Sequence, residues 1–280
     1  MNLTDLEIGV SMVTKFFIVG LPESGKTTFL GALAFTLTNS LSGKNKYEID
    51  KINEFEYMNG LADVWSSCEN IGRTNNGIYE KTTLYLKDQC GDAIELIIPD
   101  QSGEEFERVI SSREMTQVMY DDIINCDKIL VFINPNTMSK DMMINDISEE
   151  FRDGKNKNNE ITNKNNVHEQ VKYVMLLQDI AKVRKSTTDI KIIISAWDAY
   201  AYEGCPRDLL KSKVPLVWQY LSANEGSYNC EYWGISAQGG NLDDENVKSK
   251  LLDYDNPVER IIVVEQNNRE KSHDLTMLLE

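Results

Sequence analysis

The chain alternates short apolar runs with longer stretches in which apolar residues recur every three or four positions. Residues 15–20 (KFFIVG), 128–133 (KILVFI) and 189–195 (DIKIIIS) are apolar runs that predict buried strands. Residues 26–39 follow the second pattern and predict an amphipathic helix directly after the first strand. Because strands that alternate with helices form a mostly parallel sheet with helices on both faces, we expect an α/β fold.

Weaker patterns complete this order. Residues 81–87 and 93–98 resemble strands separated by a short loop with Gly91, which predicts a hairpin and one antiparallel edge strand. Helices are also expected near 52–65, within 104–121, over 168–185 and over 208–222, and a last strand over 228–236.

No repeat or inter-domain linker interrupts the pattern, so residues 1–280 are expected to form a single domain with a core at about 15–240. Two appendages are expected. Residues 138–166 are polar and end in an Asn/Lys-rich segment, which favours an insertion. Residues 257–280 are expected to form a helical tail.

Composition limits the classes of function. The net charge of −16 disfavours nucleic acid and anionic membrane as partners, because both would be repelled. No apolar run approaches the roughly 20 residues that a bilayer span needs. Five cysteines without a CxxC pair favour reduced thiols in the cytoplasm and no zinc site.

The strongest motif is GLPESGKTT at residues 20–28, which fits the phosphate-loop (P-loop, Walker A) pattern G-x-x-x-x-G-K-[ST]. The glycines permit close backbone approaches, so that loop amides and the following helix N-terminus can bind phosphates. Lys26 would reach the β- and γ-phosphates, and the Thr27 hydroxyl would ligate Mg²⁺. A glycine turn without a ligand is the alternative, but a strand before and a helix after favour nucleotide binding. The expected nucleotide contacts here are Gly20, Pro22, Glu23, Ser24, Gly25, Lys26, Thr27 and Thr28.

A carboxylate follows the strand expected at 93–98. Asp100 stands where a second magnesium-linked group is held beside a P-loop, and Gly103 can offer its amide to a γ-phosphate. A plain helix N-terminus capped by Ser102 is the alternative interpretation of this segment. The distance from the P-loop motif favours the nucleotide interpretation.

The magnesium site also needs a threonine from a loop that can move. Thr74 is the first choice, with Thr82 or Thr83 as alternatives. Arg73 lies beside it and could add positive charge to the transition state, although a solvated arginine is the commoner role in such a loop.

Two further motifs follow later strands: SAWD at 195–198 and ISAQGG at 235–240. Together with DxxG at 100–103, they occur in the order of GTPase motifs. On GLPESGKTTFL, IIPDQSGEEF and GISAQGG, the chain resembles the translation-factor/Ras-like (TRAFAC) GTPases, and within them the bacterial double-GTPase (DO-GTPase) group. The resemblance covers about residues 15–240 and implies a small-GTPase-like P-loop fold, GTP, GDP and Mg²⁺ as ligands, and a link to bacterial conflict systems.

The resemblance also implies how the base is bound. Asp198 would accept hydrogen bonds from guanine N1–H and the exocyclic amine, and Ser236 and Ala237 would place a backbone amide near O6. The chain departs from the family pattern because Ser195 and Ala196 replace the usual Asn/Thr-Lys pair. Trp197 is expected to replace part of the lost lysine cover over the base.

A second departure concerns catalysis. Glu104 stands where many members of the wider class have the glutamine that orients the attacking water, and Gln101 is nearby in sequence. The candidate catalytic residues are therefore Lys26, Gln101, Glu104 and Arg73. Hydrolysis is expected to be slow or to depend on a partner.

Three functions remain in competition. The favoured one is a cytoplasmic GTP-hydrolysing molecular switch that acts on a protein effector. The alternatives are a non-hydrolysing GTP-binding interaction module, and an ATPase or kinase built on the same P-loop. The insertion and the tail are the expected partner surfaces, and pairing into a homodimer is left open.

Overall fold

The computed structural model describes residues 12–39, 46–70, 81–99, 104–138, 168–200, 204–266 and 268–280, without the side chains of Glu104, Asn268 and Arg269. The strands are β1 (Val13–Val19), β2 (Tyr47–Ile52), β3 (Thr82–Asp88), β4 (Ala93–Ile98), β5 (Lys128–Ile133), β6 (Thr188–Ile194), β7 (Tyr228–Ser236), β8 (Ile262–Glu265) and β9 (Asn268–Ser272). The helices are α1 (Lys26–Thr38), α2 (Phe55–Ser66), α3 (Glu104–Ser112), α4 (Gln117–Asn125), α6 (Glu169–Arg184), α7 (Pro206–Lys213), α8 (Pro215–Ala223) and α9 (Glu245–Leu252), with 3₁₀ turns η2 (Trp197–Ala199), η3 (Pro257–Arg260) and η4 (Leu275–Leu279).

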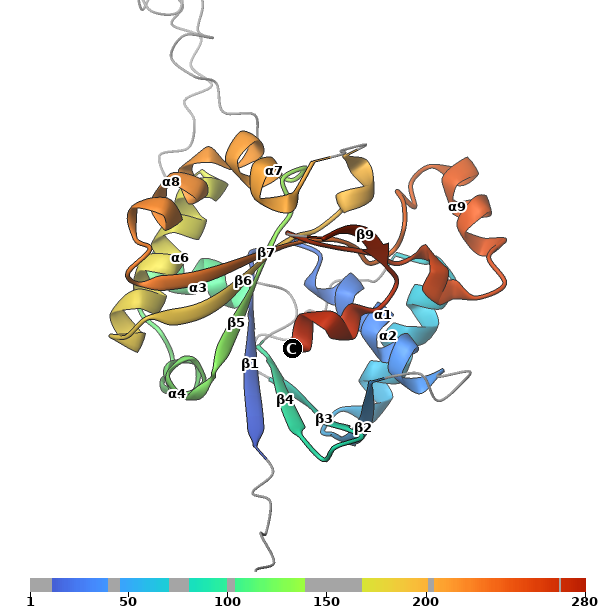
Figure 1. Cartoon of the computed structure of the whole chain (residues 1–280), viewed down its shortest axis with the longest axis horizontal. Coiled ribbons are helices and arrows are strands. Elements are labelled where there is room, and N and C mark those ends of the chain that lie inside the picture. The colour runs from blue at the N-terminus through green and yellow to red at the C-terminus, as the bar shows by residue number, and fades with distance from the viewer. Residues whose placement is uncertain are drawn as a thin grey trace, which may run out of the picture.

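The strands form one sheet in the order β2-β3-β4-β1-β5-β6-β7-β8-β9 (Figure 1). The central strands β4, β1, β5, β6 and β7 pair in parallel. The expected hairpin is present, with β3 antiparallel to β4. The α/β fold with a parallel centre is thereby confirmed.

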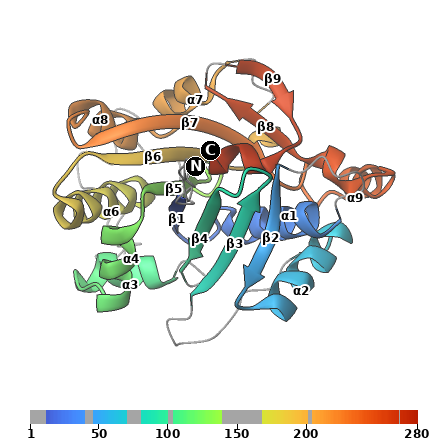
Figure 2. The same ribbon diagram turned by 60° about the horizontal axis from the view of Figure 1, so that its bottom comes forward.

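Helices cover both faces of the sheet, as expected (Figures 1 and 2). Alternate residues of β1 show the division. Phe17 and Val19 pack with α3, α4, α6, α7 and α8 in one core, whereas Phe16 and Ile18 pack with α1, α2 and the C-terminal turn in the other. Since both faces of β1 are buried, its sequence is continuously apolar, which is why the pattern revealed it.

The sequence interpretation is wrong at the two edges of the sheet. Residues 47–52 form β2, which pairs outside β3, so β3 is not the edge strand. Residues 262–265 and 268–272 form the antiparallel strands β8 and β9 where a helical tail was expected. The two edge strands, β2 (YEIDKI) and β9 (NREKS), carry charged residues, as edge strands commonly do, and so lack the apolar pattern of the centre.

The helix expected over 208–222 is two helices. Val214 has φ −130° and ψ 56°, and Pro215 begins α8. A proline disfavours helical angles at the residue before it, so the first helix must end there. The insertion expected at 138–166 lies, apart from residue 138, outside the described residues.

Gly234 on β7 allows Trp197 to lie against the sheet. A Cβ added to Gly234 would be 2.5 Å from two ring atoms of Trp197. We predict that Gly234→Ala lowers the free energy of unfolding by about 2 kcal/mol, because the buried indole must shift. Urea unfolding measures this. Gly226→Ala, whose added Cβ meets no atom within 4 Å, should change stability by less than about 0.5 kcal/mol. Equal urea midpoints for the two variants would contradict this role of Gly234.

Candidate functional site

A cavity of about 880 Å³ lies at the carboxyl ends of the parallel strands. The segment after β1 contributes Pro22 to Thr28, the segment after β5 contributes Asn134 and Asn136, and the segment after β6 contributes Ser195, Ala196 and Asp198. Ser236 at the end of β7, with Ala237 and Gln238 after it, completes this part of the lining. The carboxyl edge of an open α/β sheet is where such folds bind ligands. The volume of this cavity lies within the range found for small-molecule ligand pockets.

The turn between β1 and α1 is too tight for side chains at its two glycines. A Cβ at Gly20 would lie 2.5 Å from Ser24 Oγ and 3.0 Å from the Phe132 carbonyl oxygen. Gly25 has φ +91°, and a Cβ there would lie 2.9 Å from Ser195 Cβ. The geometry therefore requires glycine at both conserved positions of the P-loop pattern. Gly20 is buried beneath the loop rather than lining the cavity.

Lys26 is the first residue of α1, and its ammonium group is folded back into the loop. Its Nζ donates to the carbonyl oxygens of Gly20 and Leu21 at 2.8 Å each, and to Ser24 Oγ at 3.1 Å. The residue is only 4% exposed and also lines the cavity. The positive charge of Lys26 is thereby held inside the loop, at the wall of the cavity.

Helix α6 supports the loop from below through Tyr173. The Tyr173 hydroxyl donates to the Phe132 carbonyl at 2.8 Å and accepts the Leu21 amide at 3.4 Å. Burial raises the pKa of Tyr173 above its usual value of 10.0. The hydroxyl therefore stays protonated as the donor, and it joins the ends of β1 and β5 beneath the phosphate loop.

The base-recognition residues expected from the sequence meet in the wall of the same cavity. Ser236 Oγ donates a short hydrogen bond to Asp198 Oδ1 and accepts the Gly239 amide at 2.9 Å. Gly239 has φ +88°, which lets the chain turn directly after the strand. Asp198, Ser236 and Ala237 thus line one wall together, on the ends of β6 and β7.

The residues that replace the usual Asn/Thr-Lys pair have clear structural roles. Ser195 is buried under Gly25, and its amide donates to the Ile133 carbonyl at 2.9 Å. Ala196 adopts the left-handed conformation at φ +51°, a strained geometry for a residue with a Cβ. Trp197 is 4% exposed, packs on Gly234 and does not line the cavity. The expectation that Trp197 covers the base is therefore wrong.

Several expected site residues lie outside the described residues. These are Arg73, Thr74, Asp100, Gln101 and Gly103. Glu104 begins α3, and its side chain is likewise outside the description. Thr82 and Thr83, the alternative magnesium ligands, are buried within β3 and do not line the cavity.

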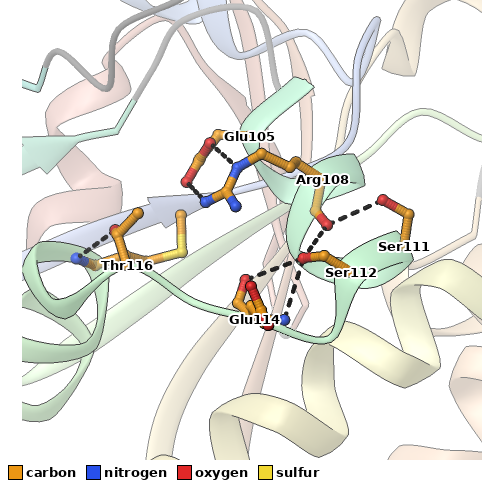
Figure 3. Close-up of polar contacts among 7 residues, drawn as sticks. Glu105, Arg108, Ser111, Ser112, Glu114 and Thr116 are labelled. Carbon is orange, nitrogen blue, oxygen red and sulfur yellow. Dashed lines mark hydrogen bonds and ion pairs between the residues drawn. The ribbon is translucent and has the colours of Figure 1, made fainter.

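Helix α3 continues directly from the segment that carries Asp100 and Gly103. Figure 3 shows its internal contacts: Arg108 Nε donates to Glu105 at 2.8 Å, and Ser112 Oγ donates to the Arg108 carbonyl at 2.8 Å. At its end, Arg113 Nη2 bonds to Asp179 of α6 at 2.8 Å, and Lys172 of α6 bonds to Glu107 at 2.7 Å. The same helix α6 therefore contacts both the phosphate loop and α3.

The cavity has site residues that the sequence interpretation missed. Asn134 Nδ2 donates to the Glu23 carbonyl at 3.2 Å and so joins the end of β5 to the phosphate loop. Asn136 Oδ1 accepts the Tyr200 hydroxyl at 2.7 Å. A polar residue directly after a buried strand was an available signal for Asn134. Glu69 and Asn70, just after α2, had no such signal.

The charge of the cavity wall is unbalanced. In the described part of its lining, Lys26 is the sole basic side chain, beside the acidic side chains Glu23, Glu69, Asp198 and Asp243. A ligand with several negative charges would therefore depend on Lys26, on backbone amides and on an added cation.

Residues 17–280 match the sequence profile of the family Double-GTPase 1 (DO-GTPase1). The chain belongs to this family. The resemblance found in the motifs is thus confirmed, and it extends beyond residue 240 to include α9 and the C-terminal strands. Membership together with the P-loop cavity supports binding of a guanine nucleotide by this DO-GTPase1 protein.

Comparisons with other proteins are more distant. No curated protein sequence matches the chain. Similar solved structures include the GTPase-like domain of S. cerevisiae Ski7 bound to GTP, with 12% identity, a TM-score of 0.42, and 84% of this chain and 46% of that chain covered. Arl6 of Trypanosoma brucei with bound GppNp has 10% identity, a TM-score of 0.40, and coverage of 85% and 99%. Sup35 with GDP has 12% identity, a TM-score of 0.37, and coverage of 85% and 41%.

Within the described segments, no helix combines the length and the apolarity that a bilayer span requires.

Removing the Tyr173 hydroxyl tests the support of the phosphate loop. We predict that Tyr173→Phe lowers the free energy of unfolding by about 1–2 kcal/mol, because the Leu21 amide and the Phe132 carbonyl lose their shared partner. Urea unfolding at neutral pH measures the loss. Tyr120→Phe, at an exposed tyrosine, is the matched control and should leave stability unchanged.

Tyr173→Phe should also change how the stability of the protein depends on pH. A tyrosine whose pKa is raised by folding contributes stability below its unfolded pKa of 10.0, and that contribution declines as the pH rises further. Loss of stability above pH 10 should therefore be less steep in Tyr173→Phe than in the wild type. An identical alkaline slope would contradict the buried, protonated hydroxyl.

Proposed function

We propose that this DO-GTPase1 protein binds GTP with Mg²⁺ in the 880 Å³ cavity and hydrolyses it to GDP and phosphate as a molecular switch. The observation that carries the proposal is the meeting of two distant motifs on one cavity. Lys26, with its ammonium group inside a tight glycine loop, lines the part of the cavity called the phosphate end below, and Asp198, beside Ser236, lines the part called the base end. One end suits phosphates and the other suits a guanine.

The phosphate end binds through charge and amides. Lys26 Nζ has three acceptors within the loop, and a phosphate oxygen would replace one of them at little cost, since the ammonium group is already positioned. Gly20 and Gly25 leave no room for a Cβ, so the turn is tight and its backbone can approach a phosphate closely. The N-terminus of α1 adds the positive end of the helix dipole.

The residues around Thr27 fit a magnesium ion. Thr27 lines the cavity at the start of α1, and the acidic wall leaves most of the triphosphate charge uncompensated by protein cations. Thr27, Asp100 and Thr74 are the proposed ligands. When bound, Mg²⁺ supplies neutralisation of charge on the β- and γ-phosphate oxygens.

The hydrolytic step is in-line attack of water on the γ-phosphorus: a P–O bond to the water forms, the bond to the β–γ bridging oxygen breaks, GDP leaves, and the proton lost by the water passes to the released phosphate or to solvent. Lys26 and the loop amides stabilise the charge that develops on the phosphate oxygens. Gln101 and Glu104 are the proposed residues that orient the water, and Arg73 is the proposed additional cation. The Gly103 amide would contact the γ-phosphate and lose that contact after hydrolysis, so the conformation of its loop would depend on whether GTP or GDP is bound.

The base end favours guanine over adenine. Asp198 carries two acceptor oxygens, and guanine offers N1–H and the exocyclic amine as donors, which adenine does not present in that arrangement. The bond from Ser236 Oγ to Asp198 Oδ1 fixes the carboxylate in place. We further propose, on family resemblance alone, that the switch acts in the bacterial cytoplasm within a conflict system and on a protein effector.

Calorimetric titration with GTP, GDP and ATP tests the two ends separately. We predict that Lys26→Ala weakens GTP and GDP about 100-fold or more, because a charged contact to phosphate is lost. Asp198→Ala should weaken guanine nucleotides to a similar degree and leave ATP unchanged. Lys211→Ala, at an exposed lysine of α7, is the control and should bind like the wild type. If ATP competed for the site with the same strength as GTP, guanine specificity would be contradicted.

Phosphate release under multiple turnover tests catalysis. GTP turnover by the wild type should exceed that of Lys26→Ala by at least the same factor. Turnover no faster than in Lys26→Ala, with tight GTP binding retained, would show a non-hydrolysing GTP-binding module instead.

A further inference from the structure

Helix α2 reaches the base end of the cavity, although it belongs to the part of the chain that packs beside α1. Trp65, near its C-terminus, is fully buried, and its Nε1 donates to the Ala237 carbonyl at 2.9 Å. Ala237 follows β7 and lines the cavity. A buried indole N–H needs an acceptor, so this bond joins two segments that are remote in sequence.

A second contact joins the same two segments. Cys68, just after α2, has φ +53°, and its sulfur lies 3.4 Å from Gln238 Nε2 and 2.9 Å from Arg260 Nη1. Gln238 lines the cavity next to Ala237. Arg260 also donates to the Ser66 carbonyl at 3.0 Å, and its guanidinium lies 5.6 Å from the centre of the Trp65 ring. The end of α2 and the loop after β7 therefore form one packed unit.

These contacts fix a peptide group of the base-recognition loop. The peptide bond is planar, so a hydrogen bond to the Ala237 carbonyl also fixes the plane that carries the Gln238 amide. The Gln238 side chain is held by Cys68 on the same side of the loop. Hydrogen bonds weaken steeply when they lose alignment, so the orientation of these amides controls any bond to an acceptor on the base.

We propose that Trp65 is a positioning residue for guanine, which holds the Ala237–Gln238 segment so that a loop amide faces the base oxygen O6. The proposal rests on the proposed function and deepens it, because it assigns a source of base selectivity outside the sequence motifs. Cys68 helps to hold the same segment through its contact with the Gln238 side chain. Glu69 and Asn70, which follow this unit in the chain, line the cavity directly, so the C-terminal end of α2 and the segment after it both bear on the site.

The test is the Trp65→Phe variant, which keeps an aromatic ring and removes the N–H donor. Its affinity is measured by calorimetry for GDP and for 6-thio-GDP, whose sulfur is a weak acceptor in place of O6. Trp65→Phe should weaken GDP about fivefold, the size expected for one hydrogen bond, and 6-thio-GDP by less than about twofold. Loss of general structure would instead weaken both nucleotides equally, which would overturn the proposal.

Two matched controls and a second variant complete the test. Trp233→Phe removes an indole donor that bonds Glu231 away from the cavity, and it should leave both affinities unchanged. Cys68→Ala should weaken GDP selectively in the same direction as Trp65→Phe. Cys126→Ala, at a buried thiol beside Arg184, should not.

The outcomes separate this proposal from the proposed function. Wild-type binding of GDP with no selective loss in Trp65→Phe or Cys68→Ala overturns the positioning role and leaves the nucleotide site intact. A wild-type protein that binds no guanine nucleotide overturns both. Thermal unfolding of each variant shows that it is folded, and if Trp65→Phe is not, Cys68→Ala decides the outcome.

Discussion

The structure depends on one tight turn between a buried strand and a helix. At Gly20 and Gly25 no Cβ fits without a clash, and between them the Lys26 ammonium group is held by two carbonyls and a hydroxyl. The two glycines let the backbone of this turn approach a ligand closely. In a chain with a net charge of −16, it places one buried cation where an anionic ligand must bind. For binding of an anion, the geometry and charge of this loop thus matter more than the net charge of the protein.

The surrounding fold serves to brace this turn. Tyr173 joins it to β5, Ser195 packs beneath Gly25, and Asn134 bonds the Glu23 carbonyl. Three different elements therefore meet the loop at the carboxyl edge of the sheet. Helix α6 also bonds α3 through Lys172 and Asp179, so one rigid helix contacts both the phosphate loop and the helix after Asp100. A change at either place has a direct physical connection to the other.

The centre of the sheet could be predicted because burial on both faces gives β1, β5 and β6 apolar runs at residues 16–19, 129–133 and 192–194. The phosphate loop could be predicted because its glycines and lysine are required locally, within nine residues. The edges could not, because β2 and β9 are polar strands whose formation depends on pairing with a neighbour.

The same distinction applies to the site. Asp198 and Ser236 were expected because the motifs SAWD and ISAQGG, which carry them, stand at the ends of recognisable strands, and both residues line the cavity. Trp65 and Tyr173 were not, because their roles arise from contacts with residues far away in the chain, for which a single sequence gives no signal. Trp197 was misjudged for a related reason. Its neighbour Asp198 faces the cavity, but the left-handed Ala196 and the missing side chain of Gly234 let the indole enter the core.

A crystal structure of the chain grown with Mg²⁺ and GDP tests the central claim most directly. The account predicts the β-phosphate within about 3 Å of Lys26 Nζ and of amides in the loop, and the guanine edge against Asp198. A GDP molecule bound elsewhere, with the Lys26 ammonium group still bonded only to the loop carbonyls and Ser24, would contradict it.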